Sequence, residues 1–181
     1  RAAVNAVQFS PDGKKILSAS ADTSAIIWDV ALGMPVKILR GHNYSIAAAS
    51  FSADGTKVIT TSSRGQTAIL WNAETGDIIA SLSGHKSFVV YAAFSPDSKN
   101  IITTSRDSTA RLWDAHDGNF LRAFKRHKGQ VNYAAFSPKN ETDTTGGKYI
   151  ATAADDRSII IWETATGSEI VTIPRFGNRV N

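Results

Sequence analysis

Three histidines recur at nearly equal spacing along the chain, and histidine is a side chain that can do chemistry. His42, His85 and His127 lie 43 and 42 residues apart. Imidazole is a common metal ligand and a common general base. Three imidazoles could hold a zinc ion, and each could join nearby serine and aspartate residues in a nucleophilic triad. The spacing therefore raises two chemical hypotheses, a metal centre and a hydrolase.

The repetition itself argues against both hypotheses. Equal spacing places the histidines at equivalent points of successive units, so they are separated in space and one structural role per unit is favoured. No Gly-x-Ser-x-Gly elbow is present, and Gly146-Gly147-Lys148 lacks the flanking residues of a phosphate-binding loop. His116 lies in an Asp-rich turn without the ligand spacing of a calcium loop. We expect no catalytic residue, no cofactor and no metal.

The repeating unit is marked by tryptophans and by Phe-Ser pairs. Trp28, Trp71 and Trp113 are 43 and 42 residues apart, and Trp162 follows after 49 because polar residues around 140–147 lengthen the fourth unit. The Phe-Ser pairs stand at 9–10, 51–52, 94–95 and 136–137. A period near this length indicates repeated supersecondary units.

Each unit reads as four short strands. In the first unit the apolar segments are 4–9, 15–18, 24–28 and 36–39, and Ser-Pro-Asp-Gly at 10–13 has the residues of a hairpin turn. The first strands are rich in alanine, which suits the crowded inner end of wedge-shaped sheets around an axis. The pattern predicts an all-β chain of four four-stranded antiparallel sheets.

These residues resemble the WD repeats that form the blades of β-propellers. The Trp-Asp pairs, the Phe-Ser-Pro-Asp-Gly turn and Gly-His at 41–42 and 84–85 agree in phase. The expected blades are 1–41, 42–84, 85–126 and 127–177, and 178–181 is expected to begin a further blade. The resemblance implies a segment of a ring of about seven or eight blades. A closed ring of four blades, or two chains that pair their open edges, are the alternatives.

The resemblance also implies a buried hydrogen-bond chain in each blade, which joins the Gly-His histidine, a Ser or Thr of the second strand, a turn Asp and the Trp indole. The histidine of the first blade would fall before Arg1, and Gly65 occupies the Asp slot of the second blade. We therefore expect the second blade to be the least rigid, or to recruit water. Carried over blade by blade, the members are Ser18, Asp22 and Trp28; His42, Thr61 and Trp71; His85, Thr103, Asp107 and Trp113; and His127, Thr152, Asp156 and Trp162.

Residues at the rim of the central channel are the candidate partner contacts that the resemblance implies. Two arginines beside an aromatic ring suit an acidic or phosphorylated peptide. The residues before the turn Asp are Ala21, Arg64, Arg106 and Asp155, and those that flank the first strands include Phe88, Val90, Gln130 and Asn132.

Composition narrows the function further. The chain of 181 residues has no cysteine and no long apolar window, so we expect a cytoplasmic location and no membrane contact. The net charge of +4 is spread over all units, which disfavours nucleic-acid binding. The leading hypothesis is a non-catalytic scaffold for other proteins or peptides, as the recognition part of a larger signalling or regulatory protein. The alternative is a propeller enzyme or small-ligand binder that uses the central channel. That alternative needs titratable groups on the inner strands, where Ala, Val, Asn and Ser are expected.

Overall fold

In the computed structural model, residues 2–140 and 143–174 are described, and they form sixteen strands and no helix. Consecutive strands pair antiparallel into four four-stranded sheets, which we number as blades 1 to 4. Within these described residues, no helix long and apolar enough to cross a membrane is present. Blade 1 contains β1 (Val4–Phe9), β2 (Lys15–Ser20), β3 (Ser24–Asp29) and β4 (Pro35–Arg40); blade 2 contains β5 (Ile46–Phe51), β6 (Lys57–Ser62), β7 (Ala68–Asn72) and β8 (Ile78–Leu82); blade 3 contains β9 (Val89–Phe94), β10 (Asn100–Ser105), β11 (Ala110–Asp114) and β12 (Phe120–Phe124); blade 4 contains β13 (Val131–Phe136), β14 (Tyr149–Ala154), β15 (Ser158–Glu163) and β16 (Glu169–Pro174).

The turn between the first two strands of a blade is held by its own side chains. Ser10 Oγ accepts a hydrogen bond from the Lys15 amide at 2.9 Å and donates to Asp12 Oδ1 at 2.6 Å. Gly13 adopts a φ of 71°, which glycine tolerates best. The same serine-aspartate pairing recurs in blades 2 and 3. This local chemistry explains why the Ser-Pro-Asp-Gly pattern marks a hairpin.

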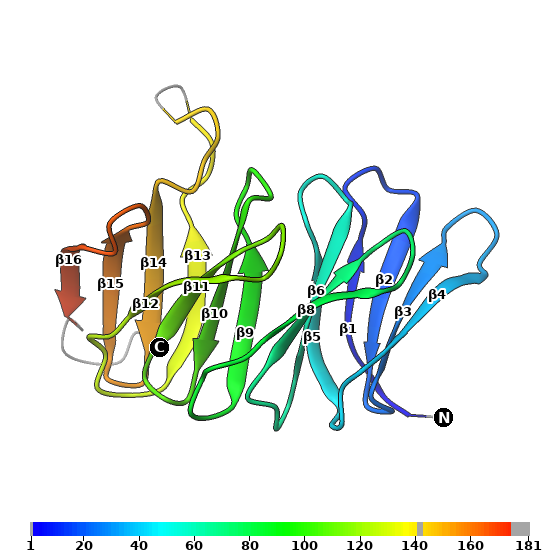
Figure 1. Ribbon diagram of the computed structural model, residues 1–181, viewed down its shortest axis with the longest axis horizontal. Helices are drawn as coiled ribbons and strands as arrows, with labels where there is room; N and C mark the ends of the chain where they lie inside the picture. The colour runs from blue at the N-terminus through cyan, green and yellow to red at the C-terminus, as the bar shows by residue number, and fades with distance from the viewer. Residues whose placement is uncertain (1, 141–142, 175–181) are drawn as a thin grey trace, which may run out of the picture.

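The four blades stand side by side in one row, from blade 4 at the left of Figure 1 to blade 1 at the right. The inner strands β1, β5, β9 and β13 contact one another in succession. Blades 1 and 4 lie at opposite ends of the row, so the ring is not closed. The alternative of a closed ring of four blades is therefore wrong. The expected start of a further blade at 178–181 lies outside the described residues.

The hydrophobic core lies between neighbouring blades. Trp71 packs with Leu17, Ile27 and Leu39 of blade 1, and Trp113 packs with apolar residues of blade 2 in the same way. Trp71 and Trp113 are only 1% and 2% exposed. Each of these tryptophans therefore joins its own blade to the preceding one.

Candidate functional site

Blade 3 contains a continuous hydrogen-bond chain. The Trp113 indole N–H donates to Thr103 Oγ1 at 2.8 Å, and His85 Nε2 lies 2.8 Å from the same oxygen. His85 Nδ1 lies 2.9 Å from Asp107 Oδ2. Because Thr103 accepts from the indole, its own proton is free to go to His85 Nε2. His85 Nδ1 then carries the ring proton and donates it to Asp107.

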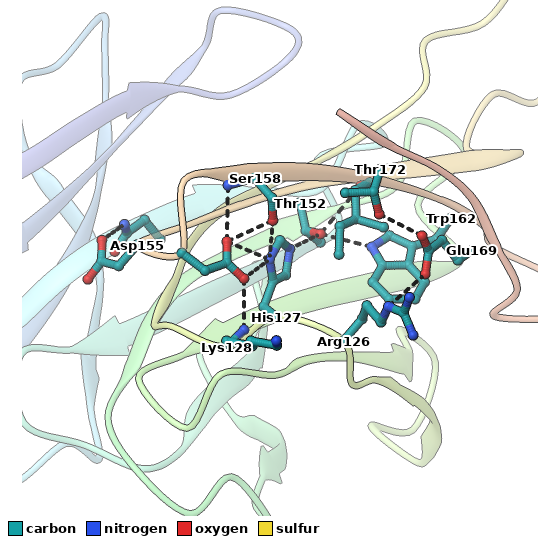
Figure 2. Close-up of polar contacts among 12 residues, drawn as sticks. Arg126, His127, Lys128, Thr152, Asp155, Ser158, Trp162, Glu169 and Thr172 are labelled. Carbon is teal, nitrogen blue, oxygen red and sulfur yellow. Dashed lines mark hydrogen bonds and ion pairs between the residues drawn. The ribbon is translucent and has the colours of Figure 1, made fainter. Parts of the chain in front are cut away.

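Blade 4 repeats this chain (Figure 2). Trp162 Nε1 and His127 Nε2 both lie 2.8 Å from Thr152 Oγ1, and His127 Nδ1 lies 2.9 Å from Asp156 Oδ2. Arg126, which replaces the glycine of the other Gly-His pairs, forms an ion pair with a carboxylate of β16 instead. The change from glycine therefore leaves the hydrogen-bond chain intact.

The turn aspartates are strongly held as anions. Burial opposes the charge of Asp107, but hydrogen bonds from Thr109 Oγ1, the Lys86 amide and His85 outweigh it and lower the pKa of Asp107 to about 2. The pKa of Asp156 is lowered in the same way by Ser158 and its neighbours. Both nitrogens of the partner histidines are thus engaged, which leaves neither for a metal or for base catalysis. Among the described residues no group of three His, Cys, Asp or Glu could hold a metal ion.

Acidification below neutrality is expected to destabilise the chain through its buried histidines. Burial lowers the pKa of His42 and His85 below 6.5, against smaller opposing hydrogen bonds. The unfolded chain therefore takes up protons that the folded chain does not. The free energy of unfolding is therefore unaffected by these two histidines above about pH 6.5, and it decreases as the pH falls below that value. Urea unfolding at pH 7.5 and 5.5 should show a lower free energy of unfolding at pH 5.5. Equal values would contradict the assignment.

Blade 2 differs from the prediction by one residue. His42 Nε2 and Trp71 Nε1 both lie 2.8 Å from Thr60 Oγ1, so Thr60 and not Thr61 joins the chain. The prediction of Thr61 is wrong, and its buried hydroxyl has no partner within the described part of the protein. Six residues, 62–67, separate the paired Thr61 and Ala68, whereas five residues fill this turn in blade 3. Because of this extra residue, the offset that leads back from Trp113 to Thr103 leads from Trp71 to Thr61 and not to Thr60.

The same extra residue shifts the rim position of blade 2. The Ser63 amide donates to the Ser45 carbonyl just as the Arg106 amide donates to the Phe88 carbonyl. Ser63 is therefore the counterpart of Arg106, and the assignment of Arg64 to that position is wrong. Counted from β6, Arg64 and not Gly65 falls level with the aspartate of blade 3.

Blade 1 has the serine–tryptophan part of the hydrogen-bond chain and the aspartate turn. The Trp28 indole N–H donates to Ser18 Oγ at 2.8 Å. Asp22 accepts from both the hydroxyl and the amide of Ser24. The turn is thus built as in blades 3 and 4.

The structure brings three of the predicted rim residues together on blades 2 and 3. Arg64 and Phe88 line one pocket of about 380 Å³, and the Arg106 guanidinium lies 5.5 Å from the centre of the Phe88 ring. Both arginines are exposed, and neither forms an ion pair within the described ranges. We call Arg64, Phe88 and Arg106 the arginine rim. Val90 follows on β9, where it is half-buried.

The predicted rim residues of blade 4 are two amide side chains and a carboxylate, and none of them is cationic. Gln130 Nε2 donates to Asn132 Oδ1, and Asn132 Nδ2 donates to Asp155 Oδ1. The Asp155 carboxylate therefore accepts from the Asn132 side-chain amide. Among the predicted rim residues that the structure describes, the two arginines therefore lie on blades 2 and 3.

Comparison with known proteins agrees with this geometry. The family model described as "WD domain, G-beta repeat" matches residues 1–29, 33–72, 76–114 and 118–163. The chain belongs to the WD-repeat family. WD-repeat proteins in general act as protein-interaction scaffolds and are generally non-catalytic.

Individual relatives match shorter stretches of this WD-repeat chain. WD repeat-containing protein 1 of Xenopus tropicalis is 42% identical over 62 residues, which cover 33% of this chain and 10% of the relative. The Bos taurus protein of the same name matches to the same extent. Apoptotic protease-activating factor 1 of Homo sapiens is 40% identical over 57 residues, which cover 32% of this chain and 5% of the relative. The aligned part is thus a tenth or less of each relative.

The inner strands of blades 3 and 4 of this WD-repeat chain carry a pair of tyrosines that the sequence analysis did not predict. Tyr91 on β9 and Tyr133 on β13 have ring centres 4.4 Å apart and hydroxyl oxygens 3.4 Å apart, beside a hollow of about 440 Å³. Their separation of 42 residues was the available signal. Burial, then the contact with Tyr133, raises the pKa of Tyr91, so its hydroxyl stays protonated. The described lining contains no His, Asp, Glu or Lys, so this hollow offers no general base.

Proposed function

We propose that the chain is a non-catalytic protein-interaction scaffold, the recognition part of a larger signalling or regulatory protein of the cytoplasm, and that it binds acidic or phosphorylated peptides. The arginine rim is the observation that supports this proposal. Its guanidinium groups have no carboxylate within ion-pair distance in the described chain, and Phe88 lies beside the Arg106 guanidinium and lines the same pocket as Arg64. The name of one relative, a protease-activating factor, also describes a regulatory protein.

The chemistry of the arginine rim fits an anionic peptide in two ways. A guanidinium group forms paired hydrogen bonds with a carboxylate or phosphate, which fixes orientation as well as charge. The half-buried Phe88 ring beside it offers apolar contact area, and arginine and aromatic residues are enriched among the residues that dominate binding energy. Stacking on Phe88 also restricts Arg106, which reduces the entropy lost on binding.

Charge reversal on the arginine rim is expected to abolish peptide capture. Fluorescent Asp/Glu-rich peptides should bind the wild-type chain more tightly than Asn/Gln-matched peptides, and the double variant Arg64→Glu/Arg106→Glu should weaken binding by at least about tenfold. Lys99→Glu is the matched control, because Lys99 is exposed in the hairpin at the other end of blade 3. Unchanged capture by the double variant, or equal loss in the control, would refute the proposal.

A further inference from the structure

The turn aspartate of blade 3 satisfies four separate hydrogen-bond donors. The Asp107 carboxylate accepts from His85 Nδ1, from the Lys86 amide, and from both the amide and the hydroxyl of Thr109. Blade 4 repeats the set around its aspartate with His127, Lys128 and Ser158. The chain therefore contains two copies of a nest of donors built around one carboxylate.

Blade 2 keeps the donors of this nest without the aspartate. The counterparts are His42 Nδ1, the Asn43 amide, and the amide and hydroxyl of Thr67. None of the four has a hydrogen-bond acceptor among the residues that the structure describes. Trp71 donates to Thr60 Oγ1, and the Thr60 hydroxyl lies 2.8 Å from His42 Nε2 and 3.4 Å from the Ile69 carbonyl oxygen. When Thr60 donates to Nε2, the ring proton of His42 lies on Nδ1, which makes Nδ1 a donor as in blade 3.

The residues that carry these donors line one pocket, and its remaining lining favours an anion. His42, Asn43 and Thr67 line the same 380 Å³ space as Arg64 and Phe88. An acidic residue at position 65 of the chain would require the Ser62 side chain to move, because a Cβ on Gly65 would collide with the Ser62 hydroxyl. Uncharged donors and one unpaired cation thus surround a space that no acidic side chain of the β6–β7 turn fills.

We propose that this pocket, the His42 pocket, binds one carboxylate group of an aspartate or glutamate side chain that a partner presents. The incoming carboxylate takes the place that Asp107 and Asp156 occupy in their own blades. Arg64 supplies the charge, and Phe88 contacts the methylene groups of the bound side chain. The inference deepens the proposed function, since it rests on the chain being a peptide-binding scaffold and assigns the position of one acidic side chain.

The test uses small probes and nuclear magnetic resonance of the 181-residue chain. N-acetyl-aspartate methylamide should shift the amide signals of Asn43 and Thr67 in a saturable way, and N-acetyl-asparagine methylamide should not. Thr67→Val removes one donor hydroxyl and should weaken the aspartate probe about tenfold. Thr75→Val is the matched control and should leave affinity unchanged, because Thr75 is exposed in the β7–β8 turn at the other end of the blade.

A variant that supplies its own carboxylate to the His42 pocket provides a second test, which measures probe binding and melting temperature. Arg64→Asp places a carboxylate level with Asp107, so it should abolish probe binding and raise the melting temperature. Absence of saturable shifts, equal affinity in Thr67→Val, or unchanged binding to Arg64→Asp would overturn the inference. Inorganic phosphate that binds these amides while the aspartate probe does not would also overturn it.

The small probes separate this inference from the proposed function. Arg106 does not line the pocket, so Arg106→Glu should leave probe binding within about twofold of wild type while it weakens capture of long peptides. Loss of the probe result alone refutes the His42 pocket. Loss of the peptide result alone refutes the arginine rim as the partner surface.

Discussion

Replacing Trp113 with alanine is expected to lower the free energy of unfolding by about 3–5 kcal/mol. Trp113 is 2% exposed and fills the core between blades 2 and 3. Its ring meets Phe120 edge-on at 5.6 Å, and its indole N–H is the first donor of the blade 3 chain. The variant therefore creates a cavity and leaves Thr103 without its donor. Urea unfolding at pH 7.5 measures the change.

Trp28→Ala is the matched control for this prediction. Trp28 makes the corresponding bond to Ser18, but it is half-buried in the end blade. The control should therefore lose clearly less stability than Trp113→Ala. An equal or larger loss at Trp28 would show that packing between blades is not what the tryptophans mainly supply.

Removing the carboxylate of Asp107 is expected to cost about 3 kcal/mol at neutral pH. Asp107→Ala leaves four donors without their acceptor, and the side chain of the His85 partner is fully buried. Differential scanning calorimetry and urea unfolding at pH 7 test this magnitude.

The difference between Asp107→Ala and wild type should depend on pH with a defined sign. The folded pKa of Asp107 is about 2, below the ordinary value of 3.8, so its stabilisation is present above about pH 4 and is lost as the pH falls toward 2. The difference in free energy of unfolding between wild type and Asp107→Ala should therefore become smaller below pH 4. Asp22→Ala is the control, because Asp22 accepts from the amide and hydroxyl of Ser24 and from no histidine among the described residues. A loss at Asp22 as large as at Asp107 would contradict the account.

Counting along the repeat predicted much of the fold because most turns have constant length. The inner strands begin at Ile46, Val89 and Val131, as the offset from each tryptophan indicates. The same count failed at Thr61, because the β6–β7 turn of blade 2 holds one extra residue. A slip of one residue moves a strand side chain to the opposite face of the sheet. Counting forward nine residues from Phe51, as from Phe94 to Thr103, reaches Thr60 and would have avoided the error.

Contacts between side chains of different strands, loops and blades could not be predicted from the sequence. The residue types of Arg106 and Phe88 indicated a binding surface, but their stacking depends on how β9 and the following turn are placed. The pairing of Tyr91 with Tyr133 depends on the angle between blades 3 and 4. The His42 pocket depends on donors that come from two separate loops. Side-chain periodicity fixes the face of a strand and not the distance between two sheets.

Hydrogen–deuterium exchange with an Asp/Glu-rich peptide tests the central claim, that the acidic partner binds the rim of blades 2 and 3. The account predicts slower exchange at 42–45, 62–67, 86–90 and 105–109 when the peptide is bound. Slower exchange confined to the hairpins at 96–99 and 143–148, or no change at any segment, would contradict it.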